Sequence, residues 1–245
     1  MDIKLSIIIG LVIVNLGFAG TVSALDSNGC LAWQSPGKVA KNTKYLISLS
    51  GKIDKQKLKN YDATKYSAEK LAYLIHTDRT VAKAVLESGR SKLAKDDKGR
   101  IDLSNADFSG ADLSSLNLNN VNLEEAQLDG ANLRYANLKG ASLEKASLNG
   151  ADLKSADLSS TKLMKTSMKY VNLAYAKMNG AQLVSVDLTG ANMCMADLSA
   201  AMFKNSVMTN AYVKKATVDM ILGPPAAFYT YPEAVFEYGL RVPGN

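Results

Sequence analysis

The chain has 245 residues, with 29 Lys and Arg against 23 Asp and Glu, and therefore a formal net charge of +6. Its one histidine, His76, has no cysteine or second histidine near it, so no Ser/His/Asp or Cys/His constellation can be assembled. No Gly-rich phosphate loop and no metal-ligand spacing occurs either. We therefore expect no enzyme activity and no catalytic, metal-binding or cofactor-binding site.

Residues 1–24 have the pattern of a signal peptide. Lys4 precedes an apolar run over residues 5–19, and Val22, Ser23 and Ala24 provide small residues where a signal peptidase would cleave. This pattern predicts export to the periplasm or secretion. An uncleaved membrane anchor is the alternative, because residues 5–24 are long enough to span a bilayer. In both cases the body of the protein lies outside the cytoplasm.

Residues 25–100 form a basic leader with 16 Lys and Arg against 8 Asp and Glu. Residues 34–62 have weak periodicity, whereas two short helices are predicted from 67 to 76 and from the N-cap Asp78 to Gly89. We expect their apolar faces to cap the first coil of the next region. The apolar residues of these faces are Leu71, Leu74, Ile75, Val81, Val85 and Leu86.

Residues 101–218 repeat with a period of five. Each of the 24 central positions, from Leu103 to Val218, is apolar, and 16 of them are leucine. Alanine occupies 16 of the positions two places earlier. A period of five fits neither a helix nor a strand, so the chain must turn at every repeat. Asp or Asn precedes the central residue in 13 units, and such side chains bond nearby backbone groups and tolerate tight turns.

Units such as Ala-Asp-Phe-Ser-Gly at 106–110 and Ala-Asn-Leu-Arg-Tyr at 131–135 resemble those of the pentapeptide-repeat family. The resemblance implies an all-β solenoid, a right-handed quadrilateral β-helix in which four units close one coil. Six such coils, stacked at strand spacing, would form a rod roughly 25–30 Å long. Both ends need caps. The last units lose the Asp/Asn preference, so we expect the final coil to be the least regular.

Residues 219–245 form the C-terminal tail, which we expect to cap the last coil. The sequence Gly223-Pro224-Pro225 breaks the pattern, and the residues after it contain more aromatic side chains than one small cap needs. We therefore consider a dimer that forms through this tail. The aromatic residues are Phe228, Tyr229, Tyr231, Phe236 and Tyr238.

Stacking of one coil of four units on the next predicts which side chains share an outer face. One face collects tyrosine, methionine and basic residues, a composition typical of protein interfaces, although scattered exposed aromatics are also ordinary. These candidate interface residues are Arg134, Tyr135, Lys154, Tyr175, Met195, Tyr212 and Lys214. Stacking also places Glu124 next to Glu144, and a glycosidase uses a pair of carboxylates of this kind. We interpret that pair as part of a compensated surface ion network, because Glu125 stacks on Lys145 and a flat face offers no cleft.

The two cysteines, Cys30 and Cys194, are candidates for a disulfide bond, because an exported chain enters an oxidising compartment. Cys194 follows the core residue Met193, so its side chain should point out of its coil. The alternative is two free thiols or an intermolecular pair, if the two Cα atoms lie beyond roughly 7 Å.

These patterns favour an exported, non-enzymatic scaffold that presents a rigid surface to a protein partner of unknown identity. The quinolone-resistance and gyrase-inhibiting members of the family suggest a DNA mimic that acts on DNA gyrase. That role needs a strongly acidic rod, and residues 101–218 carry 11 charges of each sign. Nucleic acid is therefore not an expected partner. A third interpretation places the basic leader on an anionic membrane surface, with or without the uncleaved N-terminal anchor.

Overall fold

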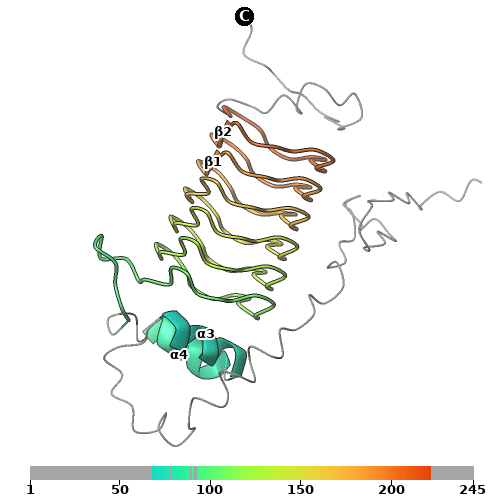
Figure 1. Ribbon diagram of the computed structural model, residues 1–245. Coiled ribbons are helices and arrows are strands. Elements are labelled where there is room, and N and C mark those ends of the chain that lie inside the picture. The colour runs from blue at the N-terminus through green and yellow to red at the C-terminus, as the bar shows by residue number, and fades with distance from the viewer. Residues whose placement is uncertain (1–67, 78, 89, 91–92, 222–245) are drawn as a thin grey trace, which may run out of the picture.

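The computed structural model describes residues 68–77, 79–88, 90 and 93–221 (Figure 1). It contains two helices, α3 (Ala68–Thr77) and α4 (Arg79–Ser88), and two strands, β1 (Gln182–Val184) and β2 (Met202–Lys204). The helices lie at one end of a stack of coils, and the strands lie near the other end (Figure 1). The predicted signal peptide, the leader up to residue 67, Cys30 and the aromatic tail lie outside the described residues.

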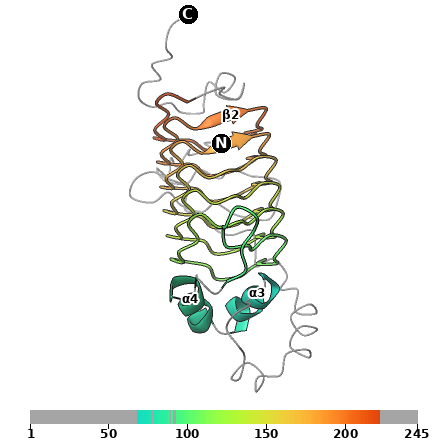
Figure 2. The ribbon, with the colours of Figure 1, turned by 90° about the vertical axis from the view of Figure 1, so that its left-hand side faces the viewer.

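The chain returns to the same face of the stack once in every coil. Parallel bridges join equivalent positions of successive coils, beginning with Asp102 and Asn122, and β1 pairs with β2 in the same register. Backbone hydrogen bonds link each coil to its neighbour in both directions. The Leu103 N–H of the first coil donates to the Asn122 carbonyl of the second at 2.7 Å, and the Asn122 N–H donates back to the Ile101 carbonyl at 2.8 Å. Four units therefore make one coil, as the sequence predicts (Figure 2).

The interior of the stack is lined by the two apolar positions of each unit. Every central residue from Leu103 to Val213 is buried, and Leu153 and its neighbour Ala151 are both 0% exposed. Two threonines replace alanine in this interior, and their hydroxyl groups are satisfied by the backbone of the preceding coil. Thr161 donates to the Leu138 carbonyl at 3.1 Å and Thr166 donates to that of Leu143 at 2.8 Å. The core therefore tolerates a hydroxyl because it has a partner.

Each unit ends at a corner where the backbone is left-handed. Every fifth residue from Asn105 to Met220 has a positive φ, and most of these residues are not glycine. The Asp or Asn before the central residue supports the turn: the Asp102 carboxylate accepts a hydrogen bond from the Ser104 N–H at 3.1 Å. The turn chemistry predicted for these short polar side chains is therefore present. The positive φ also holds large side chains, such as that of Tyr135, at the edge of the stack.

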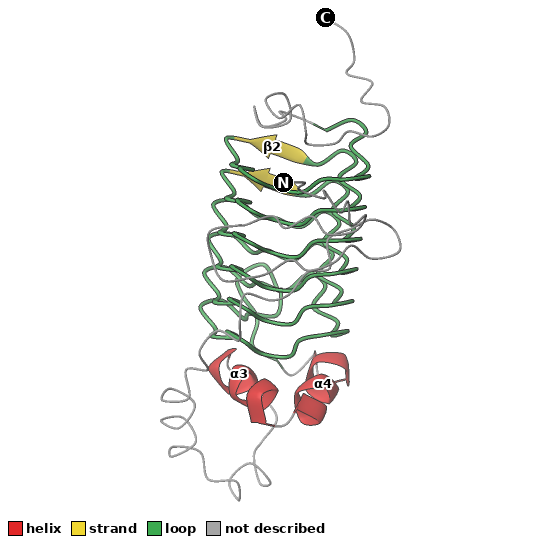
Figure 3. Ribbon diagram, turned by 90° about the vertical axis from the view of Figure 1, so that its right-hand side faces the viewer, coloured by secondary structure: helices red, strands yellow, loops and turns green. Residues whose placement is uncertain are grey.

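The two helices pack against the open first coil (Figures 2 and 3). Leu71, Leu74 and Ile75 of α3 are buried in the same apolar cluster as Ile101 and Leu103. In α4, Ala82 and Leu86 are buried in that cluster, and Val85 is half-buried against it. Of Val81, which the sequence also placed on this face, the structure describes no side chain.

The last coil keeps the register of the ladder but packs less tightly. The bridge between Asp197 and Thr217 continues the pattern of the earlier coils, whereas Ala211 and Ala216 are only partly buried. At outward and corner positions of this coil, the apolar residues Met202, Val207 and Met220 are 39%, 48% and 81% exposed. The irregularity expected from the sequence is thus in the packing of the side chains and not in the path of the backbone.

Candidate interaction face

One outer face of the stack carries the interface residues predicted from the sequence, and we call it the tyrosine face. Its residues are Arg134, Tyr135, Lys154, Tyr175, Met195, Tyr212 and Lys214. The ladder fixes their order along the stack, because the Tyr135 N–H donates to the Lys154 carbonyl at 3.1 Å and the Met195 N–H donates to the Lys214 carbonyl at 2.9 Å. The structure therefore brings together on one face positions that belong to successive coils and lie far apart in the sequence.

Arg134 and Tyr135 form the first part of this face. The guanidinium carbon of Arg134 lies 5.9 Å from the centre of the Tyr135 ring, and Arg134 Nη1 lies 3.4 Å from Asp152 Oδ2 in the next coil. Tyr135 is 58% exposed. The contact with Asp152 holds a cation beside an exposed aromatic ring, an arrangement worth about 0.5–1 kcal/mol at an exposed site.

Lys154 and Tyr175 repeat this arrangement one coil further on. The Lys154 ammonium nitrogen lies 5.1 Å from the centre of the Tyr175 ring. In the first pair the two residues are adjacent in sequence, whereas these two belong to different coils and meet only because coils stack. The sequence analysis did not identify either cation–aromatic pair or the part played by Asp152. A search for charged and aromatic positions offset by about one coil would have identified Lys154 and Tyr175 as candidates for a contact, but not the adjacent pair Arg134 and Tyr135.

Cys194 does not lie exposed on this face. It occupies the position after the central residue, as predicted, yet it is 0% exposed and packs against Ala174 in a small apolar cluster separate from the core. Tyr175 and Tyr212 lie at the edge of this cluster. Part of the outer surface of the coil is therefore buried, and two tyrosines predicted as surface residues border the buried part.

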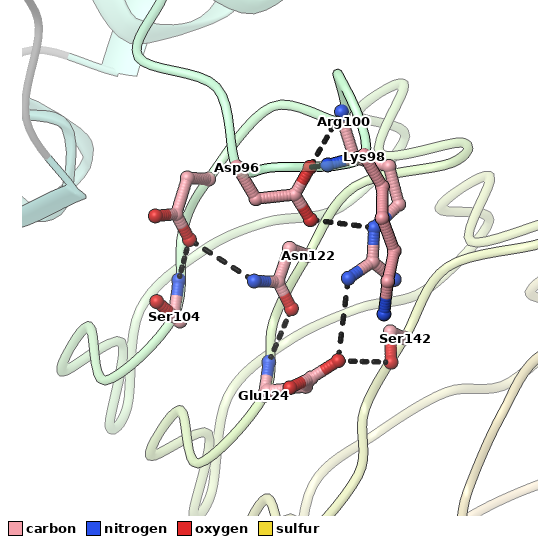
Figure 4. Close-up of polar contacts among 8 residues, drawn as sticks. Asp96, Lys98, Arg100, Ser104, Asn122, Glu124 and Ser142 are labelled. Carbon is pink, nitrogen blue, oxygen red and sulfur yellow. Dashed lines mark hydrogen bonds and ion pairs between the residues drawn. The ribbon is translucent and has the colours of Figure 1, made fainter.

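Glu124, considered above as half of a carboxylate pair, belongs to a polar network at the start of the stack (Figure 4). Its Oε1 accepts hydrogen bonds from Arg100 Nη2 at 3.3 Å and from the Ser142 hydroxyl at 3.0 Å. Arg100 Nε also donates to Asp96 Oδ2 at 2.7 Å. Burial raises the pKa of Asp96, but the hydrogen bonds and charge of Arg100 outweigh it and hold the pKa below its ordinary value.

The neighbouring carboxylate is also paired. Lys145 Nζ lies 2.7 Å from Glu125 Oε1, which is the pair that stacking of successive coils predicts. Both side chains are largely exposed, so the ion pair contributes little to stability. These contacts give Glu124 and Glu125 structural partners and support the interpretation of this region as a compensated ion network.

His76 lies on α3, at the contact with the first coil and away from the tyrosine face. Burial lowers its pKa below the ordinary value of 6.5, and this outweighs a hydrogen bond to the Asp107 backbone and the charge of Asp107. No group of three His, Cys, Asp or Glu placed to hold a metal ion occurs among the described residues. Within the same part of the chain, no helix is long and apolar enough to cross a bilayer.

The fold and the register of its coils define a parallel β-helical solenoid. The family model for pentapeptide repeats matches the chain in eight copies. The matched residues include 100–134, 131–169, 166–205 and 181–217. The chain is 35% identical to a pentapeptide-repeat protein from Nostoc PCC 7120, covering 42% of this chain and 78% of that one, with a TM-score of 0.36. The chain belongs to the pentapeptide-repeat family, whose members form right-handed β-helices.

Two other solved structures extend the comparison. A pentapeptide-repeat protein from the thylakoid lumen of Arabidopsis thaliana is 34% identical over 41% of this chain, with a TM-score of 0.33, and the match spans 66% of that protein's length. QnrB1, a plasmid-mediated fluoroquinolone resistance protein, is 15% identical, with 53% of this chain and 80% of that one covered and a TM-score of 0.33. The likeness to QnrB1 concerns the fold alone. No curated protein matches the chain.

Proposed function

We propose that this protein is an exported, non-enzymatic scaffold that binds a protein partner through the tyrosine face. The observation that carries the proposal is the exposure of Tyr135, 58%, on a backbone corner fixed by the coil ladder and beside the Arg134 guanidinium. Tyrosine and arginine are among the residue types most enriched at the energetic centres of protein interfaces.

The rigidity of the frame supports this function. Tyr135 is held on its own coil by the turn and on the next coil by the hydrogen bond to Lys154. A backbone held in this way loses little conformational entropy on binding, so more of the contact energy remains as affinity. A flat, pre-organised face of this kind suits another folded protein better than a small molecule, which needs a concave pocket.

The charge of the rod supports a protein partner over DNA mimicry. A protein that replaces DNA on DNA gyrase must present a strongly negative rod, and residues 101–218 carry 11 basic and 11 acidic residues. On the tyrosine face itself, the basic residues Arg134, Lys154 and Lys214 outnumber Asp152, the carboxylate that lies against Arg134. The surface therefore favours a partner with carboxylate groups at its binding site, which Arg134 recognises well.

The exported location rests on residues 1–24 and is tested directly by the mature N-terminus. We expect a chain that begins near Leu25 in the exported fraction, detected by intact mass and N-terminal peptide analysis of protein from the native cell. Soluble protein that retains Met1 in the cytoplasm would contradict export and would favour an intracellular target such as DNA gyrase.

The binding face is tested by site-specific photo-crosslinking in the native cell. We place a photoreactive amino acid at position 135 and, as a matched control, at position 165. Lys165 is exposed and also lies at a left-handed corner, but on another face. We expect a discrete crosslinked species of higher mass from position 135 only, lost when Arg134 is replaced by Glu. Equal crosslinking from both positions would reject the tyrosine face as the specific site.

A further inference from the structure

On the tyrosine face, the small side chains of Ala174 and Cys194 are almost fully buried, and we call their position the recess. In the column of residues that follow the central position, these two small side chains lie between Lys154 in the preceding coil and Lys214 in the following one. Ala174 is 3% exposed and Cys194 is 0% exposed. Both belong to an apolar cluster outside the core, with Tyr175 and Tyr212 at its edge.

The residues that precede the central positions are also buried in these two coils. Asn172 and Asn192 are each 3% exposed, and the Asn192 amide donates to Asn172 Oδ1 at 3.2 Å. The equivalent residues of the two preceding coils, Asn132 and Asp152, remain partly exposed. A short stretch of the outer surface, two coils deep, is therefore almost as buried as the core.

We propose that residues 30–33 of the same chain occupy this recess and that Cys30 and Cys194 form a disulfide bond. The bond rests on the export proposed above, because it requires an oxidising compartment. Cys30 is the one other cysteine of the sequence, and the apolar residues Leu31, Ala32 and Trp33 follow it directly. No free cysteine thiol occurs among the described residues, which agrees with a bonded Cys194.

The chain is long enough to reach the recess. Residues 31–67 separate Cys30 from the start of α3 at Ala68, and a segment of that length spans up to about 120 Å when extended. The coil that holds Cys194 lies about five strand spacings from the helices, or roughly 25 Å. The segment therefore reaches the recess with slack, and the attachment would run it along the outside of the stack as a strap.

The chemistry of the bond requires an oxidant, and we assign that role to a dithiol–disulfide exchange protein of the exporting compartment. The thiolate of one cysteine attacks the disulfide of that protein and forms a mixed disulfide, releasing one of its thiols. The thiolate of the second cysteine then displaces the other thiol. The Cys30–Cys194 bond forms, two electrons and two protons pass to the exchange protein, and that protein leaves as a dithiol.

The strap would divide the tyrosine face. It covers the part around Cys194, bordered by Tyr175 and Tyr212, and leaves the part with Arg134 and Tyr135 open to a partner. This explains why Tyr135 is 58% exposed while Tyr175 and Tyr212 are only partly so. The proposed partner site therefore narrows to the coils before the recess.

Intact mass analysis tests the bond. Full-length mature protein is purified from the exported fraction without reductant and alkylated under denaturing conditions, with and without prior reduction. We expect no alkylated cysteine before reduction and two after it, together with a linked peptide that contains Cys30 and Cys194. A bond between two copies of the chain, or two alkylated thiols here together with no bond after oxidation in vitro, would overturn the strap.

Oxidation of the purified chain in a glutathione redox buffer tests whether the bond forms, independently of the compartment in which the protein is found. If the Cys30–Cys194 bond forms there but the protein from cells carries two thiols, the oxidising compartment proposed for the chain is wrong, whereas the attachment of the segment at the recess stands. If the bond forms in neither sample, the strap itself is rejected.

Trp33 is the one tryptophan of the sequence, so its fluorescence reports docking. We expect emission at shorter wavelength and weaker acrylamide quenching in the oxidised protein than in the reduced protein. Cys194→Ala, which places in the recess the residue found at 174, should fluoresce like the reduced protein. Ser185→Ala, on another face, should leave the difference intact. Identical spectra for oxidised protein and Cys194→Ala would contradict docking at the recess.

Discussion

Nη1 of Arg90 lies 2.7 Å from the carbonyl oxygen of Asn117, in the first coil of the stack. Its Nη2 lies 2.7 Å from the carbonyl oxygen of Asn119. One coil further on, the equivalent carbonyl oxygens of Asn137 and Lys139 accept hydrogen bonds from the backbone of the preceding coil. Because Asn117 belongs to the first coil, the guanidinium of Arg90 supplies the two donors that a preceding coil would have supplied.

Replacing Arg90 with Ala should therefore weaken the N-terminal end of the stack. The change removes two hydrogen bonds from a charged donor and leaves two carbonyl groups without them, at a cost of roughly 1–3 kcal/mol. Arg90→Lys should recover only part of this, because one ammonium cannot match the forked geometry. Urea unfolding measures the effect, with Lys83→Ala of α4 as the control, since its exposed ion pair with Glu87 contributes little. Equal midpoints for both alanine variants would contradict the role assigned to Arg90.

The assignment of central residues to the interior predicts a large loss of stability when a single leucine is replaced. Leu153 is 0% exposed and stacks between Leu133 and Leu173, which are equally buried. Leu153→Ala should destabilise the protein by roughly 2–5 kcal/mol, because it removes buried surface and leaves a cavity. Lys162→Ala, at an exposed outward position nearby, should change the free energy of unfolding by less than about 0.5 kcal/mol. Similar losses for the two variants in chemical denaturation would show that the register is wrong.

Two glycines at equivalent corners provide a matched test of side-chain stacking between coils. Gly110 and Gly190 have φ values of 66° and 67°. A Cβ atom at Gly110 would meet nothing within 4 Å, whereas one at Gly190 would lie 2.5 Å from Cδ1 of Tyr170. Both Gly→Ala changes should cost roughly 1–2 kcal/mol from the left-handed backbone.

Gly190→Ala should cost more than Gly110→Ala by the energy needed to displace the Tyr170 ring. Thermal unfolding of both variants, and of Gly190→Ala combined with Tyr170→Ala, gives the comparison. In the absence of the Tyr170 ring the cost of Gly190→Ala should fall to that of Gly110→Ala. A cost that stays the same in both backgrounds would show that the ring does not pack on Gly190.

The lowered pKa of His76 makes stability depend on pH near neutrality. Because its folded-state pKa lies below 6.5, the unfolded chain binds a proton more readily between the two values. Stability from the neutral imidazole is therefore fully present above pH 6.5 and decreases as the pH falls toward the folded-state pKa. Urea unfolding at about pH 7.5 and about pH 5.5 should show a loss for the natural chain that is smaller in His76→Gln. Carboxylates with lowered pKa values, such as Asp96, titrate at lower pH in both proteins. An identical loss in both would reject the buried His76 contact.

The sequence by itself determined the path of the backbone and the identity of the core. A period of five with one large and one small apolar side chain leaves no regular helix or strand that buries both. Leu153 and Ala151 therefore had to point inward, and a turn had to follow. The Asp102 side chain and its equivalents could be assigned to those turns because their hydrogen bonds run to the backbone of the same turn. These features depend on neighbours in sequence, or on the same position one period later.

The tertiary structure alone decided which side chains on the outside of the coils meet. The Arg90 contact with Asn117, the position of Lys154 over Tyr175 and the burial of Cys194 do not follow from the repeat pattern. Their geometry depends on the length and rotamer of side chains on adjacent coils. The repeat pattern is compatible with many such arrangements of the outward side chains. The interior of a solenoid has one solution because apolar volume must be filled, whereas its outer faces are open to solvent and are set by individual contacts.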